Sequence, residues 1–429
     1  MKSTYQKRVL LLLCVGLCFS FSSLKAQNVA GDTLRIDLKT AEQQFLKNNL
    51  QLISQRYNVD NASAQLITAK LFPNPDFTFS NGIAGTQVSN PAREQTAGLS
   101  QLIQTAGKRN KNIELAKIGI QQAKYQFFDL LRTLKYSLHN DFYTIYYQQQ
   151  SAKVYDKEIS SLQDILSAFR TQYSKGNIAE KEVLRIASQL SSLQVEYNNL
   201  LVGIDSTQRE FRLLINASPN TTISPIVAAD EAKAIDDLNT VPYNQLLDSA
   251  YVDRYDLKLA QSAVDYSNTN LQLQKALAIP DVSLSLNYDK LGSYGNNFLG
   301  GGIEFNLPFF NRNQGGIKQA HIAIDQSKVQ LQSTQKQVEA DVAMSYKGAL
   351  RLQKLYRAMD PNLSKDFTRL INGVLDNYKK RNISLLEFLD FYDSYKNNTL
   401  QLNNLQQNLM QSLEQLNYVT GTTLFNKKY

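Results

Sequence analysis

The sequence of 429 residues contains no tryptophan, two cysteines and two histidines, and has few prolines and glycines for its length. Both cysteines, Cys14 and Cys18, lie within the first 26 residues. A chain without cysteine beyond that point can form no disulfide and offers no thiolate to a metal. His139 and His321 share no HxxxH or HxH spacing, so we expect neither a metal site nor a cofactor. No nucleophile–base pair or pair of acids stands out, and we therefore expect no enzyme.

Long apolar runs are also missing beyond the N-terminus, which excludes a membrane-spanning helix there. At the N-terminus, Lys2, Lys7 and Arg8 precede the apolar run Val9–Phe21, and a short polar stretch ends at Ala26. This pattern predicts a signal peptide over residues 1–26 that is removed from the mature chain. The segment contains four bases and no acid, so its removal lowers the formal net charge from +8 to +4. The remaining charge predicts no nucleic-acid partner.

Two stretches of the chain are closely similar: YSKGNIAEKEVL at Tyr173–Leu184 and YKKRNISLLEFL at Tyr378–Leu389. They differ in position by 205 residues, and the same offset aligns Pro75-Asp76 with Pro280-Asp281. One offset that holds over both halves predicts a duplicated unit of about 190 residues. Coincidence among helical heptads is the alternative, but it does not account for the Pro-Asp pairs.

Hydrophobic periodicity gives both units one order of elements: a leading helix, two strands, a long helix, a tight turn and a return helix. In the first unit we expect these at residues 40–71, 77–83 and 96–103, 108–173, 174–177, and 178–215. In the second we expect them at residues 243–277, 282–288 and 298–307, 316–378, 379–382, and 383–420. Thr40 and Gln43 open the first leading helix with a capping-box pattern. The units then occupy residues 27–216 and 243–420, with a connector at 217–242 and a tail at 421–429.

The long helices set the scale of the molecule. Apolar residues on both sides of the first turn recur at steps of three and four, which is typical of a coiled-coil seam. At about 1.5 Å per residue, a helix of about sixty residues is on the order of 100 Å long, which exceeds a compact globule. We therefore expect a mainly α protein with long helical hairpins and a small membrane β part.

The four predicted strands alternate as in a membrane β-barrel, apolar toward lipid and polar toward the lumen. In the last strand Leu299, Ile303 and Leu307 alternate with polar residues or glycine, and Phe309 and Phe310 follow as candidate membrane-interface aromatics. Four strands cannot close, and an open edge leaves unpaired backbone groups in hydrocarbon. Two chains would give eight strands and a cramped lumen, whereas three give twelve, so we favour a homotrimer. A small soluble sheet on a helical body is the alternative.

The duplicated helix–strand–strand–helix plan resembles the TolC family of outer-membrane efflux channels over nearly the whole mature chain. Two stretches resemble heavy-metal efflux channels of the CzcC and CusC type: SQLIQTAGKR at Ser100–Arg109 and LPFFNRNQGGI at Leu307–Ile317. Ala106 stands where that pattern has a glycine, and Asn306-Leu307-Pro308 replaces its first proline.

The resemblance implies a trimeric α-barrel that crosses the periplasm and a twelve-stranded β-barrel in the outer membrane of a Gram-negative bacterium. The implied partners are a periplasmic adaptor protein, an inner-membrane pump of the RND type and outer-membrane lipid. The chain would then be a passive exit duct, with heavy-metal cations as the expected cargo. A drug-efflux or type I secretion outlet of the same fold stays open, as does a periplasmic coiled-coil adaptor.

The resemblance also implies an acidic gate at the periplasmic tip, where the helices turn. The matching residues after the second turn are Glu387 and Asp390, and the repeat places Glu182 and Arg185 opposite them. Close carboxylates around a pore repel one another and attract cations, and Arg185 can pair with Asp390. The alternative is that Glu387 caps its own helix, because it follows Ser384 at capping-box spacing.

The turns resemble the tips that contact the adaptor in this family. The residues concerned are Lys175, Gly176 and Asn177 in the first turn and Lys380, Arg381 and Asn382 in the second. Gly176 suits a left-handed turn conformation, and Arg381 departs from that pattern. The alternative is that the basic residues are ordinary solvated loop charges.

Overall fold

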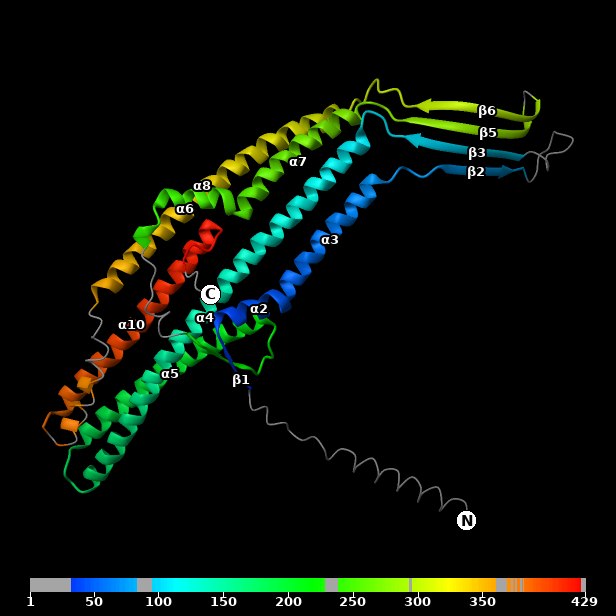
Figure 1. Ribbon diagram of the computed structural model, residues 1–429. Helices are drawn as coiled ribbons and strands as arrows, with labels where there is room; N and C mark the ends of the chain where they lie inside the picture. The colour runs from blue at the N-terminus through cyan, green and yellow to red at the C-terminus, as the bar shows by residue number, and fades with distance from the viewer. Residues whose placement is uncertain are drawn as a thin grey trace, which may run out of the picture.

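The computed structural model describes residues 32–82, 95–227, 238–292, 295–359, 369–371, 373–374, 376–378, 380 and 382–425. The predicted signal peptide, Arg381 and the last four residues of the tail lie outside this set. The described residues are mostly helical, as the sequence predicted, and contain two small β-sheets. The four-stranded sheet lies at one end of a bundle of long helices, and the tight helical turns lie at the other end (Figure 1).

The longest helix, α4 (Lys108–Ser174), has 67 residues and is therefore about 100 Å long. After a tight turn, α5 (Glu180–Ile215) packs back along it. In the second half, α8 (Gln314–Ala358) and α10 (Leu385–Thr420) occupy the corresponding places in the chain.

The sequence predicted that the long helix of the second half would run unbroken to residue 378, and this was wrong. Helix α8 ends at Ala358, and Met359 has an extended backbone. Pro361 follows two residues later, and neither a proline nor the residue before it suits a helix interior. The described residues between 369 and 378 are helical again.

Each predicted leading helix is interrupted once, which corrects a second prediction. The first consists of α2 (Leu38–Asn48) and α3 (Leu50–Lys70), and the second of α6 (Tyr243–Asp253) and α7 (Tyr255–Leu277). The residues at the two interruptions are Asn49 and Arg254, which are 205 positions apart. Both have extended backbone and are almost fully buried.

Equivalent tertiary contacts hold the two interruptions. Asn49 Nδ2 donates to the carbonyl of Leu214 at 2.9 Å, and Arg254 Nη1 donates to the carbonyl of Val419 at 3.4 Å. In addition, Asn49 Oδ1 accepts from the Leu52 N–H at 3.0 Å and so caps α3. Each carbonyl lies 165 residues along the chain from the side chain that binds it, so local sequence carries no sign of the contact.

Other helix boundaries keep the same spacing. The two ends of α2 and α6, and those of α5 and α10, differ by 205 residues, as do the starts of α3 and α7. This spacing is what a duplicated unit would give, and the duplication itself stays an inference from the sequence.

The start of α2 differs from the predicted capping box. The helix begins at Leu38, and the N-cap is Asp37, whose Oδ1 accepts from the Thr40 N–H at 2.7 Å. Thr40 is therefore inside the first turn, and its predicted role as the N-cap with Gln43 was wrong.

The larger sheet is antiparallel and has the order β2 (Asp76–Asn81), β3 (Gln95–Ile103), β5 (Val282–Gly292) and β6 (Gly295–Phe305). Its central pair, β3 and β5, joins the two halves of the chain. The predicted strands match these within a few residues, although Leu307 lies just beyond β6 and Ile83 lies outside the described residues.

The long helices next to the sheet follow the order of its strands. Helix α3 packs on α4, α4 on α7 and α7 on α8, so α3 and α8 form the edges of the layer. Toward the turns, α5 packs on α4, α4 on α10 and α10 on α8. These contacts arrange the long helices in a strip that continues into the strip of strands (Figure 1).

The connector contributes a strand beside the middle of the helices. Strand β4 (Thr222–Pro225) pairs in parallel with β1 (Thr33–Ile36). This two-stranded sheet and helices α2, α4 and α5 enclose a core that includes Phe45, Phe142 and Phe211.

Candidate functional site

One face of the four-stranded sheet is apolar and exposed. The register aligns Phe77, Leu99 and Leu286 across β2, β3 and β5, and all three are exposed, as are Leu299 and Ile303 of β6. The alternate residues, which point to the other face, are mostly polar or glycine. An exposed apolar sheet of this extent indicates contact with lipid or with another protein surface.

The two edges of this sheet are open. Among the described residues, β2 pairs with β3 alone and β6 with β5 alone. Phe309 and Phe310 follow β6, and Phe310 is 96% exposed. Their place beside the end of the strand suits the predicted membrane-interface role, which stays a prediction.

The stretch SQLIQTAGKR joins strand β3 to helix α4 through polar contacts with the other half of the chain. Asp281 accepts from the Thr105 N–H at 2.8 Å and forms an ion pair with Lys108 Nζ at 2.7 Å. Burial opposes ionisation, but the Lys108 and Thr105 hydrogen bonds outweigh it and lower the pKa of Asp281. Arg109 donates to the carbonyl of Lys70 at 2.6 Å, where α3 ends. These motif residues fix the junction between the sheet and the helices.

The stretch LPFFNRNQGGI serves the corresponding junction of the second half. Asn313 Nδ2 donates to the carbonyl of Gln274 at 2.8 Å, and Asn313 has a left-handed backbone with φ of 55°. In the first junction Ala106, with φ of 54°, and Gly107, with φ of 72°, are left-handed. A left-handed alanine costs about 1–2 kcal/mol, so a glycine at position 106 would be less strained.

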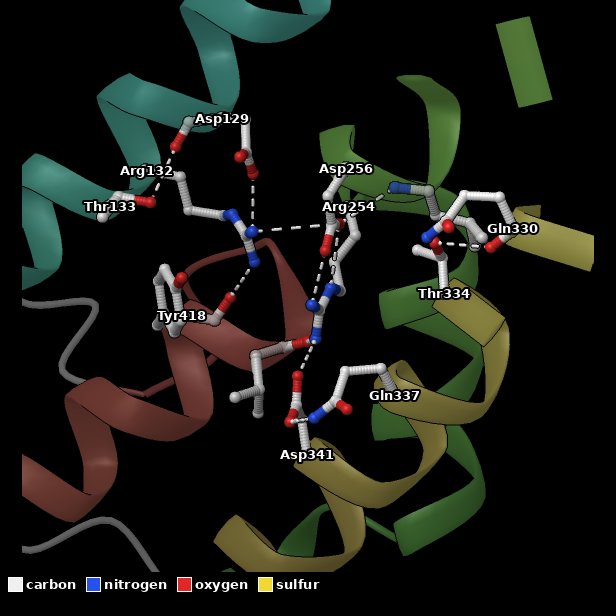
Figure 2. Close-up of polar contacts among 12 residues, drawn as sticks. Asp129, Arg132, Thr133, Arg254, Asp256, Gln330, Thr334, Gln337, Asp341 and Tyr418 are labelled. Atoms are coloured by element: carbon white, nitrogen blue, oxygen red, sulfur yellow. Dashed lines mark hydrogen bonds and ion pairs between the residues drawn. The ribbon is translucent and has the colours of Figure 1, made fainter. Parts of the chain in front are cut away.

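A network of arginines and acids connects four helices at the second interruption (Figure 2). Arg254, of which the side chain is 5% exposed, binds Asp256 at 2.6 and 3.0 Å and Asp341 of α8 at 3.1 Å. Arg132 of α4 donates to the carbonyl of Tyr418 at 2.8 Å and to Asp129 at 2.6 Å. The network therefore joins α4, α7, α8 and α10.

The buried His139 lies between two carboxylates. Its Nδ1 is 2.8 Å from Glu414 Oε2, and its Nε2 is 2.6 Å from Glu42 Oε1. Burial opposes the charge, but the two carboxylates outweigh it and raise the pKa of His139 to about 9. A protonated His139 therefore links α2, α4 and α10, and both of its ring nitrogens are occupied.

A second buried ionic cluster lies between the two hairpins, nearer the turns. Lys396 of α10 is 5% exposed and pairs with Glu196 of α5 at 3.1 Å and with Asp393 at 3.6 Å. Glu158 of α4 is 2% exposed, and its Oε1 has no hydrogen-bond partner among the described residues. Burial raises the pKa of Glu158 to about 8, although Lys396 acts in the opposite direction.

The two turns share one backbone hydrogen bond. The Asn177 N–H donates to the carbonyl of Gln172 at 3.0 Å, and the Asn382 N–H donates to that of Asn377 at 2.9 Å. Gly176 has φ of 74°, as its predicted turn role requires. Lys175 and Lys380 are exposed, and so are both asparagines; Arg381 lies outside the described residues. Contact with an adaptor stays a prediction.

The predicted gate residues have different surroundings. Glu387 forms a complete capping box: its Oε2 accepts from the Ser384 N–H at 2.8 Å, and its N–H donates to Ser384 Oγ at 3.2 Å. These hydrogen bonds lower the pKa of Glu387. Asp390 and Arg185 are exposed, and no ion pair among the described residues joins them. Glu182 is half-buried and lines a cavity with Tyr378.

Sequence reasoning missed the residues that hold the hairpins together. Asn49, Arg254, Glu158 and Lys396 are polar residues within or beside helical stretches, and nothing in the periodicity marks them as buried. The offset of 205 residues between Asn49 and Arg254 was the available signal, because it places the two residues at equivalent positions of the two units.

Among the described residues, no cluster of three or more His, Cys, Asp or Glu side chains is arranged to hold a metal ion. No described helix has the length and apolarity needed to cross a membrane.

The fold is that of the TolC-like outer-membrane channels. The structure of CmeC from Campylobacter jejuni matches with a TM-score of 0.74 at 15% identity, over 91% of this chain and 87% of that one. The structure of CusC matches with a TM-score of 0.73 at 17% identity, over 94% and 96%. VceC from Vibrio cholerae matches with a TM-score of 0.68 at 17% identity, over 90% and 96%.

Residues 246–422 match the family described as outer membrane efflux protein. The cobalt-zinc-cadmium resistance protein CzcC of Cupriavidus metallidurans is 19% identical over 274 residues, or 64% of this chain and 63% of that protein. The alignment thus spans less than two thirds of that relative. The second half of the chain is thus similar to the outer membrane efflux protein family, and the fold of most of the chain is similar to that of the solved outer-membrane channels.

Proposed function

We propose that three copies of this chain form the outer-membrane channel of a tripartite efflux system, a passive duct without enzymatic activity. The supporting observation is the four-stranded sheet with an exposed apolar face and two open edges. In hydrocarbon, each unpaired backbone group at such an edge would cost several kcal/mol, so the strands of other copies must complete the sheet.

The helices support the same assembly. The edge helices α3 and α8 expose apolar side chains along their length, among them Leu50, Ile53 and Tyr57 on α3 and Ile322 and Val329 on α8. Neighbouring copies that paired β2 with β6 would also bring α3 against α8 and cover these residues. Three copies give twelve strands, whereas two would give the smallest membrane barrels known, of about eight strands, with little room inside.

Heavy-metal cations are the cargo that we propose. The support is the similarity to CzcC, a cobalt-zinc-cadmium resistance protein, and the shared fold with CusC. Ions that pass through a water-filled lumen need no tight site in the duct, and selection would then rest with an RND-type inner-membrane pump and a periplasmic adaptor. The duplicated units at residues 27–216 and 243–420 would each supply one hairpin and two strands.

A drug-efflux or secretion outlet is the second candidate, because the fold that this chain shares with CmeC and VceC does not by itself define a cargo. A deletion strain that becomes sensitive to zinc, cobalt or copper, but not to dyes and bile salts, would support metal efflux. Sensitivity to dyes and bile salts, but not to these metals, would instead support a drug-efflux or secretion outlet. The exposed apolar sheet argues against a periplasmic adaptor, which has no lipid to face.

Arginine substitutions on the two faces of β5 test the membrane barrel. Leu286 and Asn287 are neighbours on opposite faces. We expect Leu286→Arg to cost about 2–4 kcal/mol if its side chain faces the bilayer centre, and to reduce the yield of membrane-inserted trimer. Asn287→Arg should leave the trimer intact and shift the channel toward anions. Trimer yield is measured by electrophoresis of outer membranes, and selectivity by reversal potential in planar bilayers.

The barrel proposal fails if Leu286→Arg inserts as well as the parent chain. It also fails if the processed chain proves to be monomeric and water-soluble without detergent.

The capping box allows the charge of Glu387 to be tested apart from its cap. Glu387→Gln keeps an acceptor for the Ser384 N–H but removes the charge, whereas Ser384→Ala removes half of the cap and keeps the charge. If acids of three copies ring the aperture, Glu387→Gln and Asp390→Asn should lower the cation preference in planar bilayers. Ser384→Ala should instead cost about 1 kcal/mol of stability and leave selectivity unchanged.

Glu182→Gln and Arg185→Gln extend the series to the other side of the proposed aperture. Unchanged selectivity in all four charge variants would assign Glu387 to helix capping alone.

A further inference from the structure

A cavity of about 540 Å³ lies at the tip between the two hairpins. Its walls come from the end of α4, the first turn, the start of α5, Tyr378 and the residues around the start of α10. Cavities of 300–1,000 Å³ with a mainly apolar lining and a few polar groups suit small-molecule ligands. This one touches both hairpins, so a bound ligand would bridge them.

The charged groups of this cavity have one sign. Asp164 and Glu182 are the charged residues of the lining that the structure describes, and both are acids. Apolar side chains form much of the remaining wall: Ile165, Ala168, Phe169, Ile178, Ile383 and Leu385. Two carboxylates beside an apolar surface favour a cation that carries an apolar body.

The hydroxyl of Tyr378 adds a polar group in a fixed position. Its oxygen is buried and has no hydrogen-bond partner among the described residues. The ring is stacked between Phe169 and Phe388, with centroid distances of 6.1 and 4.6 Å. Burial and the charge of Glu182 raise the pKa of this hydroxyl, and both residues line the cavity. A buried hydroxyl without a partner costs about 1–3 kcal/mol, which a ligand N–H could recover.

A larger cavity, of about 650 Å³, lies beside His139, but its charges already neutralise one another. Glu42 binds both His139 and Lys135, and Glu414 binds His139. The tip cavity differs because neither of its acids has a basic partner among the described residues.

We propose that the tip cavity binds a small organic cation, namely an ammonium group on an aromatic or aliphatic body. The ammonium group would lie between the Glu182 carboxylate and the Tyr378 hydroxyl, which accepts one of its N–H groups. The body would pack on Ile165, Ile178 and Ile383. The cation is a ligand of the chain rather than the cargo of the duct, and its binding can be measured without channel activity.

Three ligands with one body and different charge test the proposal by calorimetry on the mature full-length protein in lipid nanodiscs. At pH 7, 4-phenylbutylamine is a cation, 4-phenylbutanol is neutral and 4-phenylbutyrate is an anion. We expect the amine to bind at least ten-fold more tightly than the alcohol, and the anion not to bind. As a control, titration of each ligand into nanodiscs without protein measures its partition into lipid.

Variants of the lining locate the site. Glu182→Gln should weaken binding of the amine about ten-fold and leave the affinity for the alcohol unchanged. Tyr378→Phe should weaken binding of the amine about three-fold. Ala168→Leu should fill the cavity and weaken both ligands. Glu180→Gln is the matched control, because Glu180 is an exposed acid two residues away and outside the lining. If Glu182→Gln fails to fold, Asp164→Asn carries the charge test.

Equal affinity for amine and butyrate would overturn the proposal, and so would amine binding that is insensitive to Ala168→Leu. Neither result bears on the channel, since Leu286→Arg and Asn287→Arg test that separately.

Discussion

Replacement of Arg254 by methionine is expected to lower the free energy of unfolding by about 3–5 kcal/mol, the range found when one partner of a buried ion pair is removed. The guanidinium binds Asp256 in two places, Asp341 in one, and the carbonyl of Val419. Methionine fills similar space but leaves two acids and a carbonyl without this partner. The midpoint of thermal unfolding of the purified protein measures the loss.

The matched control is Asn49→Ala, at the same place in the first unit. Asn49 makes a cap and one hydrogen bond to Leu214 but binds no charge, so we expect a cost of about 1–2 kcal/mol. Arg254→Lys keeps the charge but loses the two-point contact with Asp256, and should fall between these values. Equal effects of Arg254→Met and Asn49→Ala would show that the acids contribute little.

Glu158→Gln is expected to stabilise the protein at pH 8 and to leave it nearly unchanged near pH 4.5. The pKa of Glu158 is raised to about 8, so the folded state keeps a proton that the unfolded chain has already released. Stability therefore falls as pH rises from the ordinary glutamate value toward 8, by roughly 3–4 kcal/mol in total. Glutamine does not ionise between pH 4.5 and pH 8, so the stability of the variant should lack this decline. Unfolding midpoints at pH 5, 6, 7 and 8 measure it.

The comparison of parent and Glu158→Gln requires that the other charges around residue 158 stay the same. Lys396 and Asp393 face Glu158 from α10, Glu196 faces it from α5, and Lys157 lies beside it on α4. The substitution leaves all four in place. Asp205→Asn, at an exposed acid of α5, is the control and should not alter the pH dependence. A parent and variant with parallel pH profiles would contradict a protonated Glu158.

The sequence predicted the helical hairpins, the turns and the strand pairs because each depends on local periodicity and turn residues. It did not predict the interruptions at Asn49 and Arg254, since both residues tolerate a helix and the contacts that hold them come from the far end of α5 or α10. Pro361 was visible, but the second long helix was predicted to be continuous like the first because the two units share one plan.

The candidate site was predictable only in part. The spacing of Ser384 and Glu387 predicted a capping box, whereas the gate was implied by the family resemblance. One chain shows the box, and a ring of acids requires further copies. Glu158 and Lys396 occur in polar stretches, and only the packing of α4, α5 and α10 reveals that their charges are buried.

Helix α4 runs without interruption from the sheet to the turn. By contrast, the neighbouring α3 and α7 are separated from the shorter helices α2 and α6 by the interruptions at Asn49 and Arg254. The end of α4 next to the sheet is held by the ion pair of Lys108 and Asp281. It is thus a rigid rod of about 100 Å that is held beside the sheet, and a tilt of about 3° at that end would move its far end by about 5 Å.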